Sequence, residues 1–237
     1  MFTRQTLINW LRTACGSTVS LPPPPCSPLR HALYTGLYPI RSGAYPNHTM
    51  VDPETRSVFH HLKGLGYRVG LLGKTHISPA VAFPFENISS RTDEIDEAAA
   101  FFNRDEQQPW FMVFASNEPH APWRSGPRER YDANKLTLPS WLHDNQITRN
   151  ALADYYAEIS ALDEQVGRLL KFIEEAGQHS KTMVWFFSEQ GSQFPSAASG
   201  VFMTTVFAWP VLFVGPATSP LAAWSMRCFN TLMSSPP

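Results

Sequence analysis

The sequence is poor in charge and contains no long hydrophobic run. Charged residues make up 16% of the 237 residues and the formal net charge is -1, whereas a typical soluble domain has about 25% charged residues. Lysines and arginines are scattered along the chain, so no basic patch for nucleic acid is expected. No uninterrupted apolar run reaches about 18 residues, so the sequence predicts no membrane-spanning helix.

Cysteine is scarce as well. The chain has three cysteines, Cys15, Cys26 and Cys228, and their odd number and irregular spacing predict neither a disulfide framework nor a zinc site. Residues 1–20 lack the compact apolar core and the cleavage site of a signal peptide. The sequence therefore predicts no signal peptide, and it sets no cellular compartment.

Apolar segments of two kinds alternate along the chain. Strand-like runs are expected at 68–72, 110–115 and 183–187, and helices at 28–35, 55–65, 94–103 and 150–176. The last helix is the clearest, because its apolar residues recur every three or four positions and Gly177 ends the pattern. Strands that alternate with helices predict an α/β fold with a largely parallel sheet, flanked by helices on both faces.

The segment 26–30 reads C-S-P-L-R and has the composition of a nucleophile turn. Arg30 lies one helical turn after Cys26, so its cation can sit beside the sulfur atom. Pro28 suits the first turn of a helix, where a missing N–H costs little. A buried structural cysteine in a proline-rich loop is the competing interpretation of these five residues.

Three further segments carry polar side chains after predicted strands. Lys74 and His76 alternate at the end of the first strand, so both can face one pocket. His120 follows the second strand in a P-H-A-P turn, and Glu189 and Gln190 follow the third. Open α/β sheets place their sites at the carboxyl ends of strands, and carboxylate and amide oxygens are ligands that Ca²⁺ prefers.

Together these segments resemble the signatures of type I sulfatases, which use formylglycine. The resemblance implies an alkaline-phosphatase-like sandwich, and it implies that Cys26 is oxidised to formylglycine by a formylglycine-generating enzyme. In that family the aldehyde hydrate attacks sulfur, as sulfate-ester hydrolysis requires. The resemblance further implies that Arg30 stabilises the hydrate and the sulfuryl charge.

The resemblance also implies roles for the other candidate residues. Lys74 and His76 would bind sulfate and assist the leaving group, and His120 would reach the sulfate. Glu189 and Gln190 would hold Ca²⁺ together with the modified Cys26.

One subgroup of the family is especially similar. The run 73–77, followed by Phe83-Pro84-Phe85, and the segment 138–142 resemble the heparan N-sulfatases, also called N-sulfoglucosamine sulfohydrolases. This similarity implies a sulfated glycan or a small sulfated sugar as substrate. The sulfate group could be attached to oxygen or to nitrogen. His48 is a further candidate for the pocket, with an ordinary loop histidine as the alternative.

The two ends of the chain depart from the family. The sequence from Ala198 can be back-translated and read with each codon's last base joined to the next two bases. This shifted reading can give the stretch that follows the metal motif in sulfatases. The same offset in residues 3–19 can give the segment that precedes the nucleophile. We therefore predict a partial catalytic domain at 21–197, with out-of-frame segments at 1–20 and 198–237.

Two other functions remain as alternatives. A non-catalytic sulfatase remnant would follow from the missing family residues, which include an Asp-Asp pair that binds calcium in the family. A related phosphoesterase of the same superfold would use serine or threonine and two zinc ions. The combination of Cys26, Pro28 and Arg30 argues against the phosphoesterase.

Overall fold

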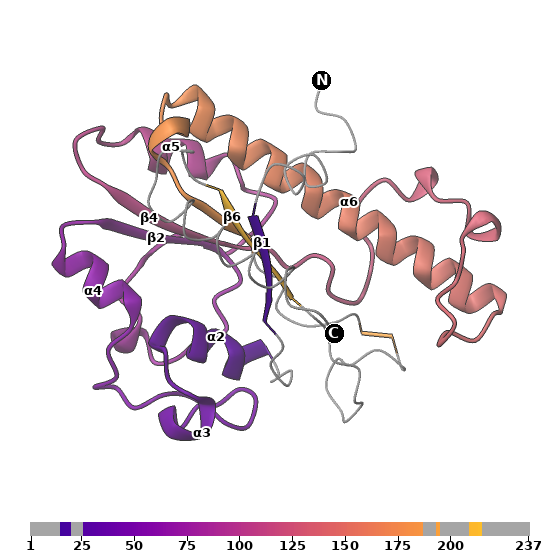
Figure 1. Ribbon diagram of the computed structural model, residues 1–237, viewed down its shortest axis with the longest axis horizontal. Helices are drawn as coiled ribbons and strands as arrows, with labels where there is room; N and C mark the ends of the chain where they lie inside the picture. Colours follow the sequence, from indigo (N-terminus) through magenta and orange to yellow (C-terminus); the bar gives the residue numbers. More distant parts are fainter. Residues whose placement is uncertain (1–14, 20–25, 187–192, 195–208, 215–237) are drawn as a thin grey trace, which may run out of the picture.

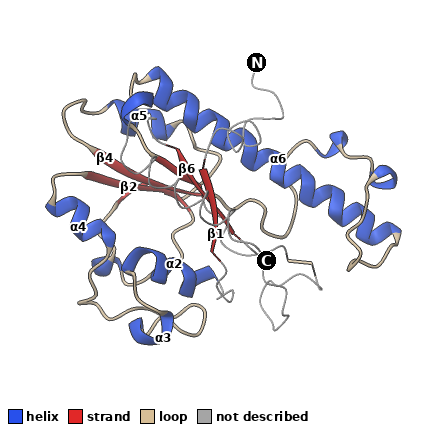
Figure 2. Cartoon of the chain, viewed as in Figure 1, coloured by secondary structure: helices blue, strands red, loops and turns tan. Residues whose placement is uncertain are grey.

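The computed structural model describes residues 15–19, 26–186, 193–194 and 209–214. The helices are α2 (Cys26–Thr35), α3 (Pro39–Ser42), α4 (Val58–Gly64), α5 (Glu97–Asn103) and α6 (Gln146–Glu175). The strands are β1 (Cys15–Val19), β2 (Arg68–Gly73), β3 (Glu86–Ser89), β4 (Trp110–Ala115), β5 (Val184–Phe186) and β6 (Trp209–Val214). Short 3₁₀ turns lie at Ala80–Ala82, Arg128–Arg130, Ala133–Lys135 and His179–Lys181. Figure 2 shows helices and strands interleaved as in an α/β fold.

Strands β3, β2 and β4 form a parallel sheet in that order. The register of β2 and β4 runs without a break from the pair Arg68 and Trp110 to the pair Gly73 and Ala115. All six residues of β2 are buried, because helices cover both faces of the strand. The predicted strands at 68–72 and 110–115 are confirmed, and β3 is an addition that the sequence pattern did not indicate.

The third predicted strand, β5, pairs differently from the expected parallel arrangement. It is antiparallel to β6, which is antiparallel to β1, so these strands form a second sheet in the order β1-β6-β5. Hydrophobic patterning identifies strands but does not reveal which strands pair or in which direction. Strands β1 and β6 lie within the segments expected to be out of frame, and that hypothesis stays a prediction.

Side chains of β4 alternate between two hydrophobic clusters. Phe111 and Val113 pack with a cluster that includes Phe59 of α4, whereas Met112 and Phe114 pack with a cluster that includes Phe101 of α5. Successive residues of a strand point to opposite faces, so the two clusters lie on the two faces of the sheet. Figure 1 shows α5 and α6 on one side of β2 and β4, with α2, α3 and α4 on the other.

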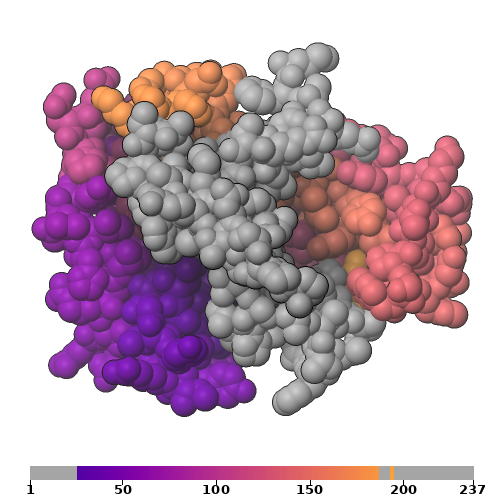
Figure 3. All heavy atoms as spheres, viewed as in Figure 1, coloured from indigo at the N-terminus to yellow at the C-terminus, as the bar shows by residue number. Residues whose placement is uncertain are grey.

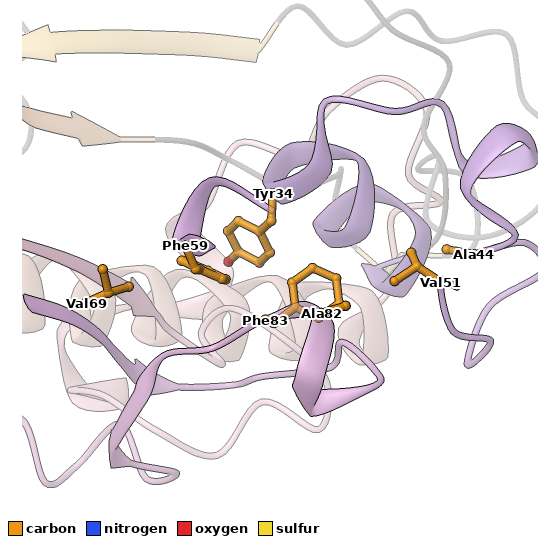
Figure 4. Packing of buried hydrophobic residues seen from close by; sticks show 7 residues of the cluster. All are labelled: Tyr34, Ala44, Val51, Phe59, Val69, Ala82 and Phe83. Carbon is orange, nitrogen blue, oxygen red and sulfur yellow. The ribbon is translucent and has the colours of Figure 1, made fainter. Parts of the chain in front are cut away.

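The first cluster joins the segment that carries Cys26 to the sheet. The ring centroid of Tyr34 in α2 lies 4.9 Å from that of Phe59 in α4, and the centroid of Phe83 lies 6.3 Å from that of Phe59. Figure 4 shows these rings together with Val69 of β2. Through this cluster the aromatic contacts hold α2 against α4 and the sheet. In Figure 3 the indigo and purple part of the chain, which includes α2, gathers on one side of the molecule.

Helix α6 is longer than the prediction of 150–176 because it begins earlier. Asn145 caps its amino end by accepting a hydrogen bond from the backbone N–H of Thr148 at 2.9 Å. Residues 146–149 are mostly polar, so the apolar period does not mark this turn. Helix α4 is shorter than predicted, because Ser57 and His60 form a capping box that sets its start.

Candidate functional site

The carboxyl ends of β2 and β4 are joined at one edge of the parallel sheet. The backbone N–H of Lys74 donates to the carbonyl of Ala115 at 2.8 Å. Gly73 has a φ of 99°, in a region that favours glycine. A Cβ at Gly73 would lie 2.3 Å from the Ala115 oxygen, so this close approach of the two strands requires glycine.

Cys26 is the first residue of α2, so the predicted nucleophile turn is the first turn of a helix. The residue is 7% exposed. The backbone N–H of Ser27 donates to the side-chain oxygen of Asn47 at 3.2 Å, which ties the turn to the loop that carries His48. The amino end of a helix favours negative charge nearby.

Arg30 brings the first two sequence motifs together. Its Nη1 donates to the carbonyl oxygen of Lys74 at 2.7 Å, across a separation of 44 residues. The Arg30 side chain is buried, with the residue 8% exposed. The structure therefore places the cation of the C-S-P-L-R segment against the backbone of the G-K-T-H segment.

His31 is a second link between the same segments, and the sequence motifs did not indicate it. The residue is fully buried, and its Nδ1 lies 2.7 Å from the Ser27 carbonyl oxygen, which can only accept. Its Nε2 lies 3.0 Å from both the N–H and the carbonyl oxygen of Ser78. His31 thus links the first turn of α2 to Ser78, which lies two residues after His76.

His76 and His48 lie in contact. Nε2 of His76 is 2.9 Å from Nδ1 of His48, and the ring centroids are 4.7 Å apart. Both residues have positive φ, 49° for His76 and 64° for His48, which is uncommon for residues other than glycine. The structure therefore brings these two candidates together, although no sequence pattern indicated their contact.

His120 is held by its own turn and by Gln193. Nδ1 of His120 lies 2.6 Å from the Ala121 carbonyl, and the amide oxygen of Gln193 accepts from the Ala121 N–H. The Gln193 amide nitrogen therefore faces Nε2 of His120, at 3.0 Å. Because the two backbone groups fix both orientations, His120 has Nδ1 as donor and Nε2 as acceptor in this arrangement.

The residue after Gln193 anchors the same region. Phe194 stacks on Trp123 with centroids 4.7 Å apart and contacts Tyr155 at 5.7 Å. Desolvation by burial raises the pKa of the Tyr155 hydroxyl. These contacts place Gln193 and Phe194 beside His120 and helix α6.

Glu118 forms a polar network immediately before His120. Its Oε2 accepts from the Ser116 hydroxyl at 2.6 Å and from the Gln165 amide at 3.2 Å. Gln165 lies on α6, so the network ties the turn after β4 to that helix. Thr92 adds a longer contact of 3.5 Å to the same oxygen.

The proposed calcium ligands Glu189 and Gln190 lie outside the described residues. Within the part of the chain that the structure describes, no three His, Cys, Asp or Glu side chains gather to hold a metal ion. The calcium ligands therefore stay a prediction.

Comparison with known proteins finds similarity to sulfatases. The family model described as Sulfatase matches residues 83–200. The chain is 25% identical over 227 residues to the human N-sulphoglucosamine sulphohydrolase, covering 78% of this chain and 44% of that relative. It is also 25% identical over 213 residues to an ulvan-active sulfatase of Formosa agariphila, covering 82% of this chain and 41% of that relative. The chain thus spans less than half the length of these relatives.

Solved structures show the same fold. A protein of Bacteroides fragilis assigned to the sulfatases superposes with a TM-score of 0.75 at 19% identity, covering 90% of this chain and 63% of that one. A phosphonate monoester hydrolase from Silicibacter pomeroyi superposes with a TM-score of 0.76 at 16% identity, covering 92% of this chain and 64% of that one. No helix among the described residues is long and apolar enough to cross a membrane. The chain is thus similar to the sulfatases over residues 83–200, and it has their alkaline-phosphatase-like α/β fold.

Proposed function

We propose that this protein hydrolyses sulfate esters or sulfamates of sulfated sugars, with a formylglycine made from Cys26 as the nucleophile. The observation that carries the proposal is the hydrogen bond from Arg30 to the Lys74 carbonyl at 2.7 Å. It joins the nucleophile turn to the strand end that carries Lys74 and His76. This contact between two segments that resemble separate sulfatase signatures supports a single site.

Cys26 and Arg30 would serve the attack on sulfur. The hydrated aldehyde supplies a hydroxyl nucleophile when it is present. The buried Arg30 guanidinium lies one helical turn from Cys26 and would stabilise the negative charge that develops on the sulfuryl oxygens. The amino end of α2 adds a partial positive charge at the same position.

Lys74, His76 and His120 would bind the sulfate and move protons. Lys74 and His76 follow β2, and His120 follows the adjacent parallel strand β4. An ammonium group binds a sulfate oxygen as a compact charge. An imidazole within reach of the leaving oxygen can act as its general acid.

Calcium completes the proposal. Glu189, Gln190 and the modified Cys26 would hold Ca²⁺ through oxygen atoms, which this ion prefers. The ion would supply positive charge beside the sulfate. A formylglycine-generating enzyme is the protein partner that this proposal requires.

Sulfated sugars are the proposed substrate class because of the relatives' names. One relative is named for N-sulphoglucosamine and another for ulvan. Both names support a sugar that carries sulfate, on nitrogen in the first case.

The first experiment is mass spectrometry of the peptide that contains Cys26. The chain is co-expressed with an active formylglycine-generating enzyme, and conversion is checked against a control substrate of that enzyme. We expect the aldehyde at Cys26, followed by release of sulfate from a sulfated glucosamine. Cys26→Ser, which offers no thiol for oxidation, is the matched negative control.

Other outcomes would redirect the proposal. An unmodified Cys26 beside a fully converted control would support the non-catalytic remnant. Turnover of a phosphonate monoester without an aldehyde at Cys26, and no turnover of any sulfate, would support the phosphoesterase.

A further inference from the structure

Helix α4 begins with a cap that depends on a histidine. The backbone N–H of Ser57 donates to Nδ1 of His60 at 3.2 Å, and the Ser57 hydroxyl oxygen lies 3.2 Å from the same nitrogen. Ser57 is fully buried, so water cannot readily replace the ring as the acceptor. A capping box usually has Glu or Gln in the place of His60. A histidine there accepts the bond only while Nδ1 is unprotonated.

The surroundings of His60 favour this unprotonated state. Burial lowers the pKa of the His60 imidazole, and the nearby cation Arg56 lowers it further. The Val81 carbonyl, in the 3₁₀ turn that follows β2, acts in the opposite direction, and that turn carries no ionisable side chain. His61 and Lys63 of α4 add smaller effects that lower the pKa. The groups that act on the ring include no carboxylate that would hold a proton there.

The first turn of α4 also holds the core against α2. Phe59 is the neighbour of His60 in this turn and is fully buried. Its ring contacts Tyr34 of α2 and Phe83. A change at the cap of α4 therefore reaches the aromatic cluster that joins α2 to the sheet.

We propose that His60 is a pH-sensitive cap, whose protonation in mild acid opens the first turn of α4 and loosens the contact between α4 and α2. This inference goes beyond the proposed function and does not depend on it. A protonated Nδ1 can donate to the Ser57 hydroxyl, but it has no lone pair left to accept from the Ser57 N–H. A buried N–H that loses its acceptor is unfavourable, so protonation and the closed turn exclude one another.

The direction of the effect follows from the two states of the chain. The pKa of His60 is lower in the folded chain than in the unfolded chain, so the unfolded state takes up the proton first as the pH falls. The cap therefore has its full strength above the ordinary histidine pKa of about 6.5. It weakens as the pH falls below that value.

Hydrogen exchange of the full chain, followed by NMR from about pH 8 to about pH 5, tests the proposal on both sides of the ordinary histidine pKa. After correction for the intrinsic pH dependence of exchange, we expect protection of the Ser57 amide to fall about fivefold in acid, the scale of a lost helix cap. The amides of β2 are the reference and should keep their protection. His60→Gln supplies an oxygen that does not titrate, so its Ser57 amide should stay protected over the whole range.

His61→Gln is the matched control, because His61 is the exposed neighbour of His60 on α4. It should keep the loss of Ser57 protection seen in the wild type. Protection of the wild-type amide that does not change with pH, or an equal fall in His60→Gln, would overturn the proposal. If His60→Gln does not fold, an NMR titration of the wild-type His60 ring decides. A midpoint below the ordinary histidine value supports the cap, and a midpoint at or above it overturns the cap.

Discussion

Buried polar side chains hold the loops of this protein to its helices. Arg30 and His31 reach from α2 to the loop after β2, and Glu158 reaches from α6 to the loop after β4. Each ends on backbone groups of the loop. A buried donor or acceptor that loses its partner costs about 1–3 kcal/mol.

Glu158 offers the clearest stability test at this scale. The residue is 3% exposed, and its Oε1 accepts from the N–H groups of Arg124 and Ser125, both at 2.7 Å. We expect Glu158→Leu to lower the free energy of unfolding by about 3 kcal/mol, because two N–H groups lose their acceptor. Glu158→Gln keeps an oxygen and should lose less in the same urea titration. Equal losses in the two variants would contradict this account.

His31 can be tested in a similar way. His31→Leu leaves the Ser78 N–H without its imidazole acceptor, and we expect a loss of about 2 kcal/mol in the free energy of unfolding. His31→Gln carries one donor and one acceptor and should recover part of the loss. Hydrogen exchange at the Ser78 amide reports the contact directly. Unchanged protection of that amide in His31→Leu would show that the contact does not hold the loop.

Glu86 links stability to pH. Hydrogen bonds from Arg104, both at 2.6 Å, lower the pKa of the Glu86 carboxyl. A carboxyl with a lowered folded-state pKa stabilises the fold above its unfolded-state pKa, and the contribution is lost as pH falls through the folded-state value. Wild type should therefore be more stable than Glu86→Gln at neutral pH. Denaturation across the acid range should show the difference shrinking, and a difference that persists in strong acid would refute the assignment.

At the scale of elements, the end of β2 depends on one glycine. Gly73→Ala would push a Cβ to 2.3 Å from the Ala115 oxygen, at a φ that alanine disfavours. We expect a loss of more than about 2 kcal/mol in stability, together with displacement of Lys74 and lower activity. Thermal unfolding and sulfatase assays measure both effects. Gly64→Ala, where nothing lies within 4 Å of the added Cβ, is the control and should be tolerated.

Elements with a strong local signal could be predicted from the sequence. The long apolar period of α6 and the apolar runs of β2 and β4 are of this kind. The four-residue helix α3 and the short, partly exposed strand β3 have too few periodic residues to be recognised. The antiparallel pairing of β5 with β6 depends on contacts between distant residues, which periodicity does not encode.

At the scale of the whole molecule, the parallel sheet separates two cores. Phe59 belongs to the cluster on the side of α2 and α4, and Phe101 to the cluster on the side of α5 and α6. Phe59→Leu and Phe101→Leu should each lower the free energy of unfolding by about 1–2 kcal/mol. The double variant should lose the sum within about 0.5 kcal/mol, because distant sites without shared partners are additive. A larger coupling in chemical denaturation would show that the sheet transmits strain between its faces.

The candidate site was predictable only where its residues lie in local motifs. Cys26 and Arg30 share one helical turn, so their proximity follows from the sequence. The contact of His48 with His76 and that of His120 with Gln193 join separate loops, and no spacing rule gives them. The roles of all these residues stay predictions until the experiments above are done.

The burial of Cys26 has a consequence for the timing of maturation. In the folded chain the residue is 7% exposed, and the next amide is bound to Asn47, which is 20 residues away in sequence. An enzyme that must bind the peptide around Cys26 competes with formation of the contact between Ser27 and Asn47. Under the proposed function, oxidation of Cys26 and folding would then be in kinetic competition. Slower folding would give a larger fraction of modified chains.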